Sequence, residues 1–287
     1  MSSLTLRTVL QQADRTIALA RRDAPRLSAE LLIAEAMGLS RLELLLRLDQ
    51  PISPEEYSRV RDNIQRRAKG EPVAYIRGYK EFYGRNFFVS PGVLIPRPES
   101  ELLIDLALDL FGPEAAFRFA DLCTGSGNLG ISMASERSFS RGIGTEISRR
   151  AVQAADKNRR HHGLGHRFAL AQASLGSCLR KSSFEAVLCN PPYLSEAEVA
   201  SVSPEISGFE PIGALRGGRE GQELSLQVLK AAEHILKPCG ILLLETGPGQ
   251  AGPLYQAARM SPCWQELCLH RDLAGKDRVL CAVRCGL

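Results

Sequence analysis

Apolar residues recur every three or four positions through the first seventy residues, the pattern of helices that each bury one face. The first such series consists of Leu6, Val9, Leu10, Ala13 and Ile17. A second series runs from Ser28, a possible helix cap, to Gly38, a stop signal. Ser53-Pro-Glu-Glu predicts another helix start, because a capping residue precedes proline and two acidic residues. We therefore predict a small helical domain in this part of the chain.

Aromatic and β-branched residues replace this pattern between about residues 74 and 95, from Tyr75-Ile76 to Val93-Leu-Ile95. Gly84 and Pro91-Gly92 interrupt the stretch, which predicts a hairpin or two short strands. After the following Pro-Arg-Pro segment, we expect a helix over residues 99–111.

Short apolar runs alternate with helical stretches from residue 115 onward. Strands are expected at residues 117–122, 142–146, 167–171, 186–189, 240–244 and 278–283. Helices are expected around residues 128–137, 148–162, 221–236 and 249–260. This alternation predicts a doubly wound, mainly parallel sheet.

Composition narrows the protein class. The 287 residues are 44% hydrophobic and 24% charged, which excludes collagenous, disordered and coiled-coil proteins. No apolar run approaches the roughly 18 residues that a membrane span needs. The eight cysteines form no CxxC pair and no zinc-site spacing, so we expect no metal. They favour small buried thiols in a reducing cytoplasm over a disulfide framework.

The positive charge is concentrated in the first third of the chain. Residues 1–90 hold 15 Lys and Arg against 11 Asp and Glu, whereas the remainder holds 21 of each. This excess fits a solvated helix face, or a surface for an acidic or nucleic-acid-bound partner, and is too small to name nucleic acid as substrate. Asp14 and Asp23 interrupt the composition of a transit peptide, so we interpret the start as a helix of the folded protein.

A glycine-rich loop is the first candidate for chemistry. Asp121-Leu-Cys-Thr-Gly-Ser-Gly-Asn-Leu-Gly130 follows an apolar run and opens a predicted helix. Its glycines permit a tight turn and close approach of a ligand. Glu146 lies 19 residues beyond Gly127, at the end of the next predicted strand, where a carboxylate can bind ribose hydroxyls. This order favours a nucleotide-type cofactor over an ordinary tight turn.

Two classes of cofactor compete for this loop. A dinucleotide would place its pyrophosphate at the helix N-terminus, but the Asp121 carboxylate would repel that anion. S-adenosylmethionine carries ammonium and sulfonium charges, together with a ribose for Glu146. Electrostatics therefore favour the methyl donor.

A second motif, Asn190-Pro191-Pro192-Tyr193, directly follows a predicted strand. Two prolines cannot continue a central strand, so the chain must leave the sheet at its carboxyl edge, where doubly wound sheets bind ligands. Asn190 offers an amide oxygen, Pro191 a backbone carbonyl and Tyr193 an aromatic face. These groups can accept the two N–H bonds of a planar amino or amide nitrogen and stack on its plane.

With both motifs in place, the chain resembles class I methyltransferases that act on planar nitrogens. Over essentially its full length it resembles the HemK/PrmC family, protein-(glutamine-N5) methyltransferases that modify peptide-chain release factors. The remaining segments that carry this resemblance are Glu71-Pro72 through Gly78, Glu81 through Gly84, Val93 through Glu101, Glu210-Pro211, Ala214 through Gly218, Leu244-Glu245 with Gln250, and Asp272 through Arg278.

The resemblance implies an α/β fold with a Rossmann-like class I methyltransferase sheet, a small N-terminal all-helical domain and a β-hairpin connector. The implied domains are a substrate-docking domain at residues 1–73, the connector at 74–95 and the methyltransferase domain at 96–287. The implied activity is methyl transfer from S-adenosylmethionine to N5 of the glutamine in the Gly-Gly-Gln loop of release factors, leaving S-adenosylhomocysteine. The implied enzyme is a cytoplasmic monomer that needs no metal, direct nucleic-acid contact or membrane.

The resemblance also assigns residues to the site. The implied catalytic residues are Asn190, Pro191, Pro192 and Tyr193. The implied cofactor-binding residues are Asp121, Cys123, Thr124, Gly125, Ser126, Gly127, Glu146, Ser174, Leu175 and Asn190.

Some positions depart from the family pattern. Ser100 stands where the family usually has threonine, Glu146 where aspartate is commoner, and Thr246 where histidine is usual. Ala173-Ser174-Leu175 replaces a common Ser-Asp pair, so the acidic group expected near the adenine amino group is missing. Ser174 can accept one hydrogen bond there instead, with Leu175 packing on the ring.

Two other functions remain open from the residues alone. The Asn-Pro-Pro-Tyr geometry also serves adenine N6 or cytosine N4, so a nucleic-acid amino-methyltransferase is the main alternative. A non-enzymatic cofactor-binding module would have no use for that motif. A dehydrogenase is disfavoured by Asp121.

Overall fold

The computed structural model describes residues 4–286, which divide into two compact units. One unit contains residues up to 79 together with residues 203–209. The other contains residues 80–202 and everything from residue 210 onward. Each unit has its own apolar core.

The first unit is helical, as its apolar spacing predicts. Its helices are α1 (Leu6–Leu19), α2 (Pro25–Met37), α3 (Arg41–Leu46), α4 (Pro54–Ala68), α5 (Val73–Arg77) and α10 (Pro204–Phe209). All five apolar residues of the first predicted series are buried on one face of α1. Helix α10 belongs to this unit although its sequence neighbours belong to the other one, and Glu205 pairs there with the buried Arg67 at 2.7 Å.

Helix boundaries in this unit confirm two sequence signals and correct a third. Ser53 caps α4 in a capping box with Glu56, and Gly38 ends α2 in the left-handed conformation. Ser28 is not a cap, because α2 begins three residues earlier at Pro25, whose fixed φ suits a first helical position. The buried Ser28 hydroxyl instead donates to the Asp23 carbonyl.

The aromatic stretch forms a shorter hairpin than its composition suggests. Its two strands are β1 (Tyr79–Phe82) and β2 (Arg85–Phe88). Tyr75-Ile76 was expected to be extended but lies in α5, and residues 93–95 form no strand. Tyr75 and Ile76 still pack inward, since helical neighbours can bury aromatic and β-branched side chains as well as strands can.

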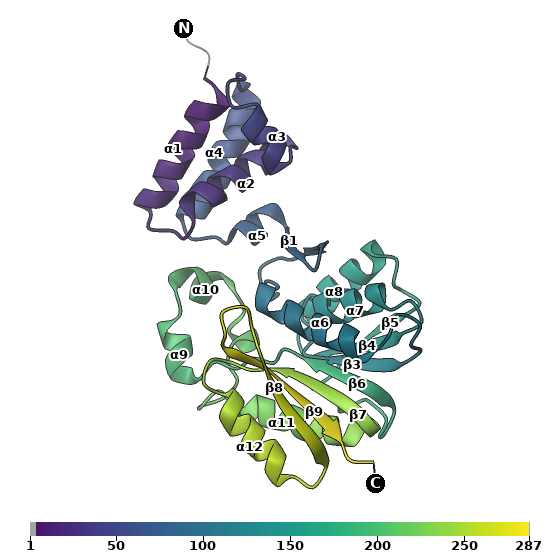
Figure 1. Ribbon diagram of the computed structural model, residues 1–287. Helices are drawn as coiled ribbons and strands as arrows, with labels where there is room; N and C mark the ends of the chain where they lie inside the picture. Colours follow the sequence, from purple (N-terminus) through teal and green to yellow (C-terminus); the bar gives the residue numbers. More distant parts are fainter. Residues whose placement is uncertain (1–3, 287) are drawn as a thin grey trace. The chain divides into compact units, whose positions relative to one another are not determined.

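The second unit contains a seven-stranded sheet with the order β5-β4-β3-β6-β7-β9-β8 (Figure 1). The first five strands in this order are parallel, whereas β9 and β8 are antiparallel additions at one edge. The strands are β3 (Arg118–Leu122), β4 (Arg141–Glu146), β5 (Phe168–Gln172), β6 (Phe184–Cys189), β7 (Leu236–Glu245), β8 (Trp264–Arg271) and β9 (Asp277–Arg284). The doubly wound, mainly parallel sheet is therefore confirmed.

Two apolar layers enclose this sheet. One face packs with α6 (Glu101–Leu110) and α7 (Asn128–Glu136) around Phe119 and Phe168, and α8 (Arg149–His161) contacts β4 and β5. The other face packs with α11 (Glu223–Ile235) and α12 (Ala251–Met260). The remaining short elements are η1 (Pro98–Ser100), α9 (Glu196–Ser201) and η2 (Ile212–Ala214).

One strand of the sheet, β8, was not predicted from the sequence pattern. In β8, exposed polar residues and half-buried apolar ones mix with a single buried residue, Trp264, because this antiparallel strand lies at the edge of the sheet. Within residues 4–286, no helix is long and apolar enough to cross a membrane. All eight cysteines are free thiols.

Candidate active site

The two sequence motifs meet where the strand order of the sheet reverses. The central strand β3 has β4 on one side and β6 on the other. Leu122 and Cys189 are register partners, so the glycine loop after β3 and Asn190 after β6 leave the sheet side by side. In doubly wound sheets, this crevice at the carboxyl ends of the strands is where ligands bind.

A cavity of about 350 Å³ opens at this edge. Its volume lies within the range of roughly 300–1,000 Å³ that is typical of small-molecule sites. The predicted site residues that line it are Cys123, Gly125, Glu146, Ser174, Leu175, Asn190 and Pro192. Thr124 and Ser126 line a smaller neighbouring cavity together with Arg97, Ser100 and Asn190. Gly127 lines neither cavity and is the N-cap residue of α7, with a φ of 83°.

Asp121 holds the glycine loop from beneath. Its carboxylate Oδ2 accepts hydrogen bonds from the Thr124 hydroxyl at 2.5 Å and from the Gly130 amide at 2.9 Å. A side chain on Gly130 would meet the Phe168 ring at 2.2 Å, so this close approach requires glycine. Asp121 is fully buried and lines neither cavity, which differs from the direct cofactor contact that the charge argument expects. Burial raises its pKa to about 7, although the two hydrogen bonds act to lower it.

Glu146 ends β4 with its carboxylate at the cavity wall. Its two oxygens accept backbone hydrogen bonds from Gly125 at 3.1 Å and Ser148 at 2.9 Å. A carboxylate has about four acceptor positions, so capacity remains for two hydroxyl donors. These contacts also tie the glycine loop to the strand beside it.

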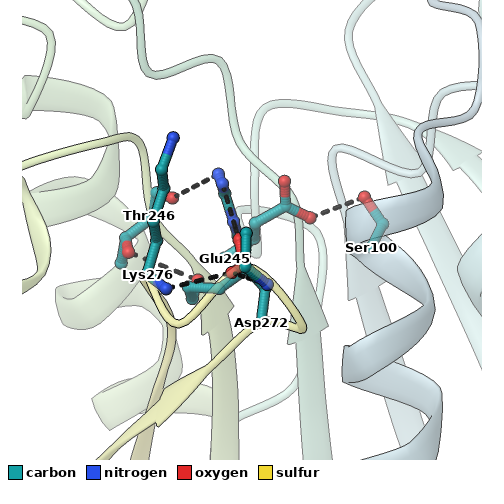
Figure 2. A network of polar contacts seen from close by, with 7 residues as sticks. Ser100, Glu245, Thr246, Asp272 and Lys276 are labelled. Carbon is teal, nitrogen blue, oxygen red and sulfur yellow. Dashed lines mark hydrogen bonds and ion pairs between the residues drawn. The ribbon is translucent and has the colours of Figure 1, made fainter.

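Asn190 takes part in a hydrogen-bond chain that begins in the protein interior. Its Nδ2 donates to the Ser100 hydroxyl at 2.8 Å, and that hydroxyl donates to Glu245 Oε2 at 2.6 Å. Figure 2 shows the Glu245 carboxylate directed toward Ser100. Ser100 and Glu245 are both buried. Ser100 borders the smaller cavity, and Asn190 lines both cavities. The chain therefore joins the cavity wall to the end of β7.

The rest of the Asn-Pro-Pro-Tyr motif is fixed by neighbouring loops. Gln250 Nε2 donates to the Tyr193 carbonyl at 2.5 Å. A side chain on Gly217 would lie 2.5 Å from the Pro192 carbonyl and 2.8 Å from Tyr193 Cα, so only glycine fits there. Pro191 is buried, and neither it nor Tyr193 lines either of the two cavities described above. Burial raises the pKa of the Tyr193 hydroxyl, which therefore stays neutral.

The segment around Glu245 has its own support (Figure 2). The backbone amide of Thr246 donates to the Arg278 carbonyl at 2.8 Å, and the Arg278 guanidinium pairs with Asp272 at 3.0 Å. Asp272 also accepts the backbone N–H of Lys276, which closes the turn between β8 and β9. Burial raises the pKa of Glu245 to about 7, against the lowering effects of Ser100 and Arg278.

Several residues of the site were not assigned a role from sequence. Ser100 and Glu245 reach Asn190, and Gln250 reaches Tyr193. Glu210 holds the segment before η1, since it accepts the Ile95 amide at 3.2 Å and pairs with Arg97 at 2.6 Å. The available signal was positional, because Glu245 directly follows the strand predicted at residues 240–244, at the same sheet edge as Glu146.

Profiles of two known domain families match the chain. The PrmC N-terminal domain matches residues 8–78, and the methyltransferase small domain matches residues 100–205.

Solved structures share the fold at low sequence identity. A Pyrococcus furiosus methyltransferase aligns with a TM-score of 0.52 and 15% identity, over 78% of this chain and 98% of that chain. A T. thermophilus 16S rRNA methyltransferase, RsmC, in complex with AdoMet and guanosine, aligns with a TM-score of 0.51 and 19% identity, over 72% and 49%. These similarities assign a Rossmann-like methyltransferase fold.

Curated relatives match over nearly the whole chain. The release factor glutamine methyltransferase of Nitratidesulfovibrio vulgaris is 39% identical over 99% of this chain and 96% of its own length. The protein of the same name from Moorella thermoacetica is 35% identical over 98% and 99%. The chain therefore belongs to the release factor glutamine methyltransferase family.

Proposed function

We propose that this protein transfers a methyl group from S-adenosylmethionine to the side-chain amide nitrogen N5 of the glutamine in the Gly-Gly-Gln motif of a peptide-chain release factor. The observation that carries the proposal is the position of Asn190, on the wall of the cavity that the glycine loop and Glu146 also line. Membership of the family supports this substrate class. We propose that the reaction takes place in the cytoplasm.

The residues of the larger cavity fit the methyl donor. Glu146 has free acceptor capacity for ribose hydroxyls, and Ser174 and Leu175 provide a hydroxyl and an apolar wall for the adenine. Asp121 would act through the glycine loop that it holds. When bound, S-adenosylmethionine supplies an electrophilic methyl group on sulfonium sulfur and leaves as S-adenosylhomocysteine. No metal is part of the proposal.

The chain's contribution to the reaction is positioning. An amide nitrogen is a poor nucleophile because its lone pair is delocalised into the carbonyl. Asn190 Oδ1 and the Pro191 carbonyl would each accept one of its two N–H bonds, which holds the nitrogen in line with the methyl group. Alignment of this kind can remove several kcal/mol from the barrier. Tyr193 would pack beside the amide plane and exclude water.

The helical unit is proposed to dock the release factor. It holds 13 Lys and Arg against 11 Asp and Glu, and contains none of the residues proposed to bind the methyl donor. The match to the PrmC N-terminal domain covers most of it. We propose that a single chain provides both the docking unit and the site.

Mass spectrometry of a release factor co-expressed with this protein tests the proposal. We expect one added methyl group on the glutamine of the Gly-Gly-Gln motif, and an unmodified glutamine when the partner is the Asn190→Ala variant. Methyl incorporation into nucleic acid, with none into the release factor, would contradict the proposal and favour an amino-methyltransferase of nucleic acid.

A further inference from the structure

We propose that Ser100 and Glu245 are positioning residues that fix the Asn190 side-chain amide with its oxygen toward the substrate and its nitrogen toward the protein interior. The role in catalysis rests on the proposed function. The orientation itself is a property of the protein alone and can be measured without a reaction.

The hydrogen bond between Ser100 and Glu245 is buried. Glu245 is fully buried, and Ser100, which borders the smaller cavity, is 1% exposed, so bulk water has little access to the hydrogen bond between them. The distances are 2.6 Å from the Ser100 hydroxyl to Glu245 Oε2 and 2.8 Å from Asn190 Nδ2 to the Ser100 hydroxyl. Both are within the normal range for hydrogen bonds.

The direction of each hydrogen bond follows from the number of protons that Ser100 and Glu245 can donate. An ionised carboxylate can only accept, and a serine hydroxyl has a single proton to donate. Ser100 must therefore give its proton to ionised Glu245, which leaves only its lone pairs to face Asn190. Only the Nδ2 end of the amide can donate to those lone pairs. The buried carboxylate thus selects one of the two amide orientations.

The orientation of the Asn190 amide also matters for the substrate. A glutamine amide presents two N–H donors, so a partner that holds its nitrogen must present an acceptor. With Nδ2 directed to Ser100, Asn190 presents Oδ1. The reversed amide would present its own N–H groups to those of the substrate, and two donors cannot form a hydrogen bond.

The orientation of the Asn190 amide is expected to depend on pH. When Glu245 is protonated, it can donate to Ser100, which frees the serine proton to face Asn190 and permits the reversed amide. Burial raises the pKa of Glu245 to about 7. Correct orientation is therefore favoured above about pH 7 and weakens as the pH falls through it.

Other charged groups around Glu245 also affect its pKa. Arg278 on β9 and Arg97 beside η1 favour the ionised form, and Glu99 opposes it. Burial raises the pKa values of Tyr193 and Cys189, so both stay neutral near pH 7. Asp121 in the glycine loop also titrates near pH 7. Glu245→Gln and Asp121→Asn separate these two carboxyl groups.

Nuclear magnetic resonance of the full chain labelled with ¹⁵N-asparagine measures the orientation directly. The chain has five asparagines, Asn63, Asn86, Asn128, Asn158 and Asn190, so the side-chain amide spectrum is simple. Loss of a signal pair in Asn190→Asp identifies the Asn190 amide. Asn158, which is buried and donates to the Phe88 and Ser126 carbonyls, is the internal reference.

We expect the Asn190 amide signals to shift with an apparent pKa of about 7 in the wild type and in Asp121→Asn. The shift should be absent in Glu245→Gln and Ser100→Ala, while the Asn158 signals stay constant. An Asn190 amide that does not titrate, or that titrates unchanged in Glu245→Gln, would overturn the proposal. This result does not depend on the identity of the methylated substrate.

Single-turnover methylation of a release factor tests the effect of Ser100 on the rate of methyl transfer. Ser100→Ala should lower the rate about 10- to 100-fold, as expected for a misoriented contact to the reacting group, with cofactor affinity unchanged. Ser100→Thr restores the hydroxyl and should recover most of the rate. Ser140→Ala is the matched control, because it removes a buried hydroxyl that donates to the Arg137 carbonyl, and should keep the wild-type rate.

The pH profile distinguishes positioning from support of the fold. In the wild type, the rate should fall as the pH decreases through about 7. Glu245→Gln should remove the part of this fall that comes from Glu245, whereas Asp121→Asn should keep that part. A Ser100→Ala variant that is fully folded and fully active would overturn the kinetic role. If the wild type methylates no release factor, the proposed function fails, and the amide titration still decides the orientation.

Discussion

Three acidic side chains near the site differ in what surrounds them. Glu146 reaches the cavity and keeps free acceptor positions. Asp121 and Glu245 are buried, and burial raises the pKa of each to about 7. The first therefore suits ligand binding, whereas the other two hold protein groups in place.

At the residue scale, Asp121 predicts a pH dependence of stability. Its pKa is raised from 3.8 to about 7, so between these values the folded chain binds more protons than the unfolded chain. The contribution of Asp121 to the free energy of unfolding therefore falls as the pH rises from about 4 to about 7, and each unit of pKa difference corresponds to about 1.4 kcal/mol. Asp121→Asn should remove this contribution, so that in urea denaturation the free energy of unfolding changes less unfavourably between pH 4 and pH 7 than in the wild type. An unchanged slope would contradict the prediction.

Glu146 supports a second prediction at this scale. Glu146→Ala should weaken S-adenosylmethionine binding by about 1–3 kcal/mol, the cost of losing hydrogen bonds to a charged group. Isothermal titration calorimetry measures this change. Glu266→Ala, which removes an exposed carboxylate on β8, is the matched control and should bind normally. Equal affinity in both variants would remove Glu146 from the cofactor site.

The sequence was sufficient to predict that Asn190, Glu146 and the glycine loop lie close together, because strand ends at one edge of a parallel sheet are neighbours. It was not sufficient to connect Ser100 to Asn190. These residues are 90 positions apart, and their contact depends on the side-chain rotamers chosen when two loops pack. The burial of Asp121 also depends on packing, since a strand-end carboxylate can point into the cavity or beneath the loop.

At the scale of elements, the start of α4 can be tested on its own. The Ser53 hydroxyl accepts the Glu56 amide at 3.2 Å, and the Glu56 carboxylate accepts the Ser53 amide at 2.9 Å. Ser53→Ala should lower the free energy of unfolding by about 1 kcal/mol. Ser58→Ala, within the same helix, should be neutral or slightly stabilising because alanine has the higher helix propensity. Chemical denaturation of both variants checks this, and equal stabilities would contradict it.

Elements with a strong periodic signal were predicted well. The five parallel strands are short apolar runs because both faces of the sheet are covered. The edge strand β8 gave no such run, and the composition around Tyr75 suggested a strand where α5 forms. The sequence could not predict helix α10 or assign it to a unit, because the ion pair between Glu205 and Arg67 joins residues that are far apart in the sequence.

At the scale of the whole molecule, the helical unit and the site can be separated by truncation. Deleting residues 1–70 should leave S-adenosylmethionine binding intact, because all proposed cofactor-binding residues lie in the other unit. Methylation of an intact release factor should be lost. The deletion also removes Arg67, the ion-pair partner of Glu205 in α10. Calorimetry and transfer of a labelled methyl group measure the two properties. A soluble truncated chain with full activity would show that docking lies elsewhere.

The most direct test of the central claim is single-turnover methylation of a purified release factor, with the modified atom located by tandem mass spectrometry. The wild type should place one methyl group on the side-chain nitrogen of the Gly-Gly-Gln glutamine. Asn190→Ala should bind the methyl donor but react about 10²- to 10³-fold more slowly, the usual cost of losing one oriented hydrogen-bonding group at a reacting centre. A wild-type rate in Asn190→Ala, or a methyl group on any other residue, would contradict the account.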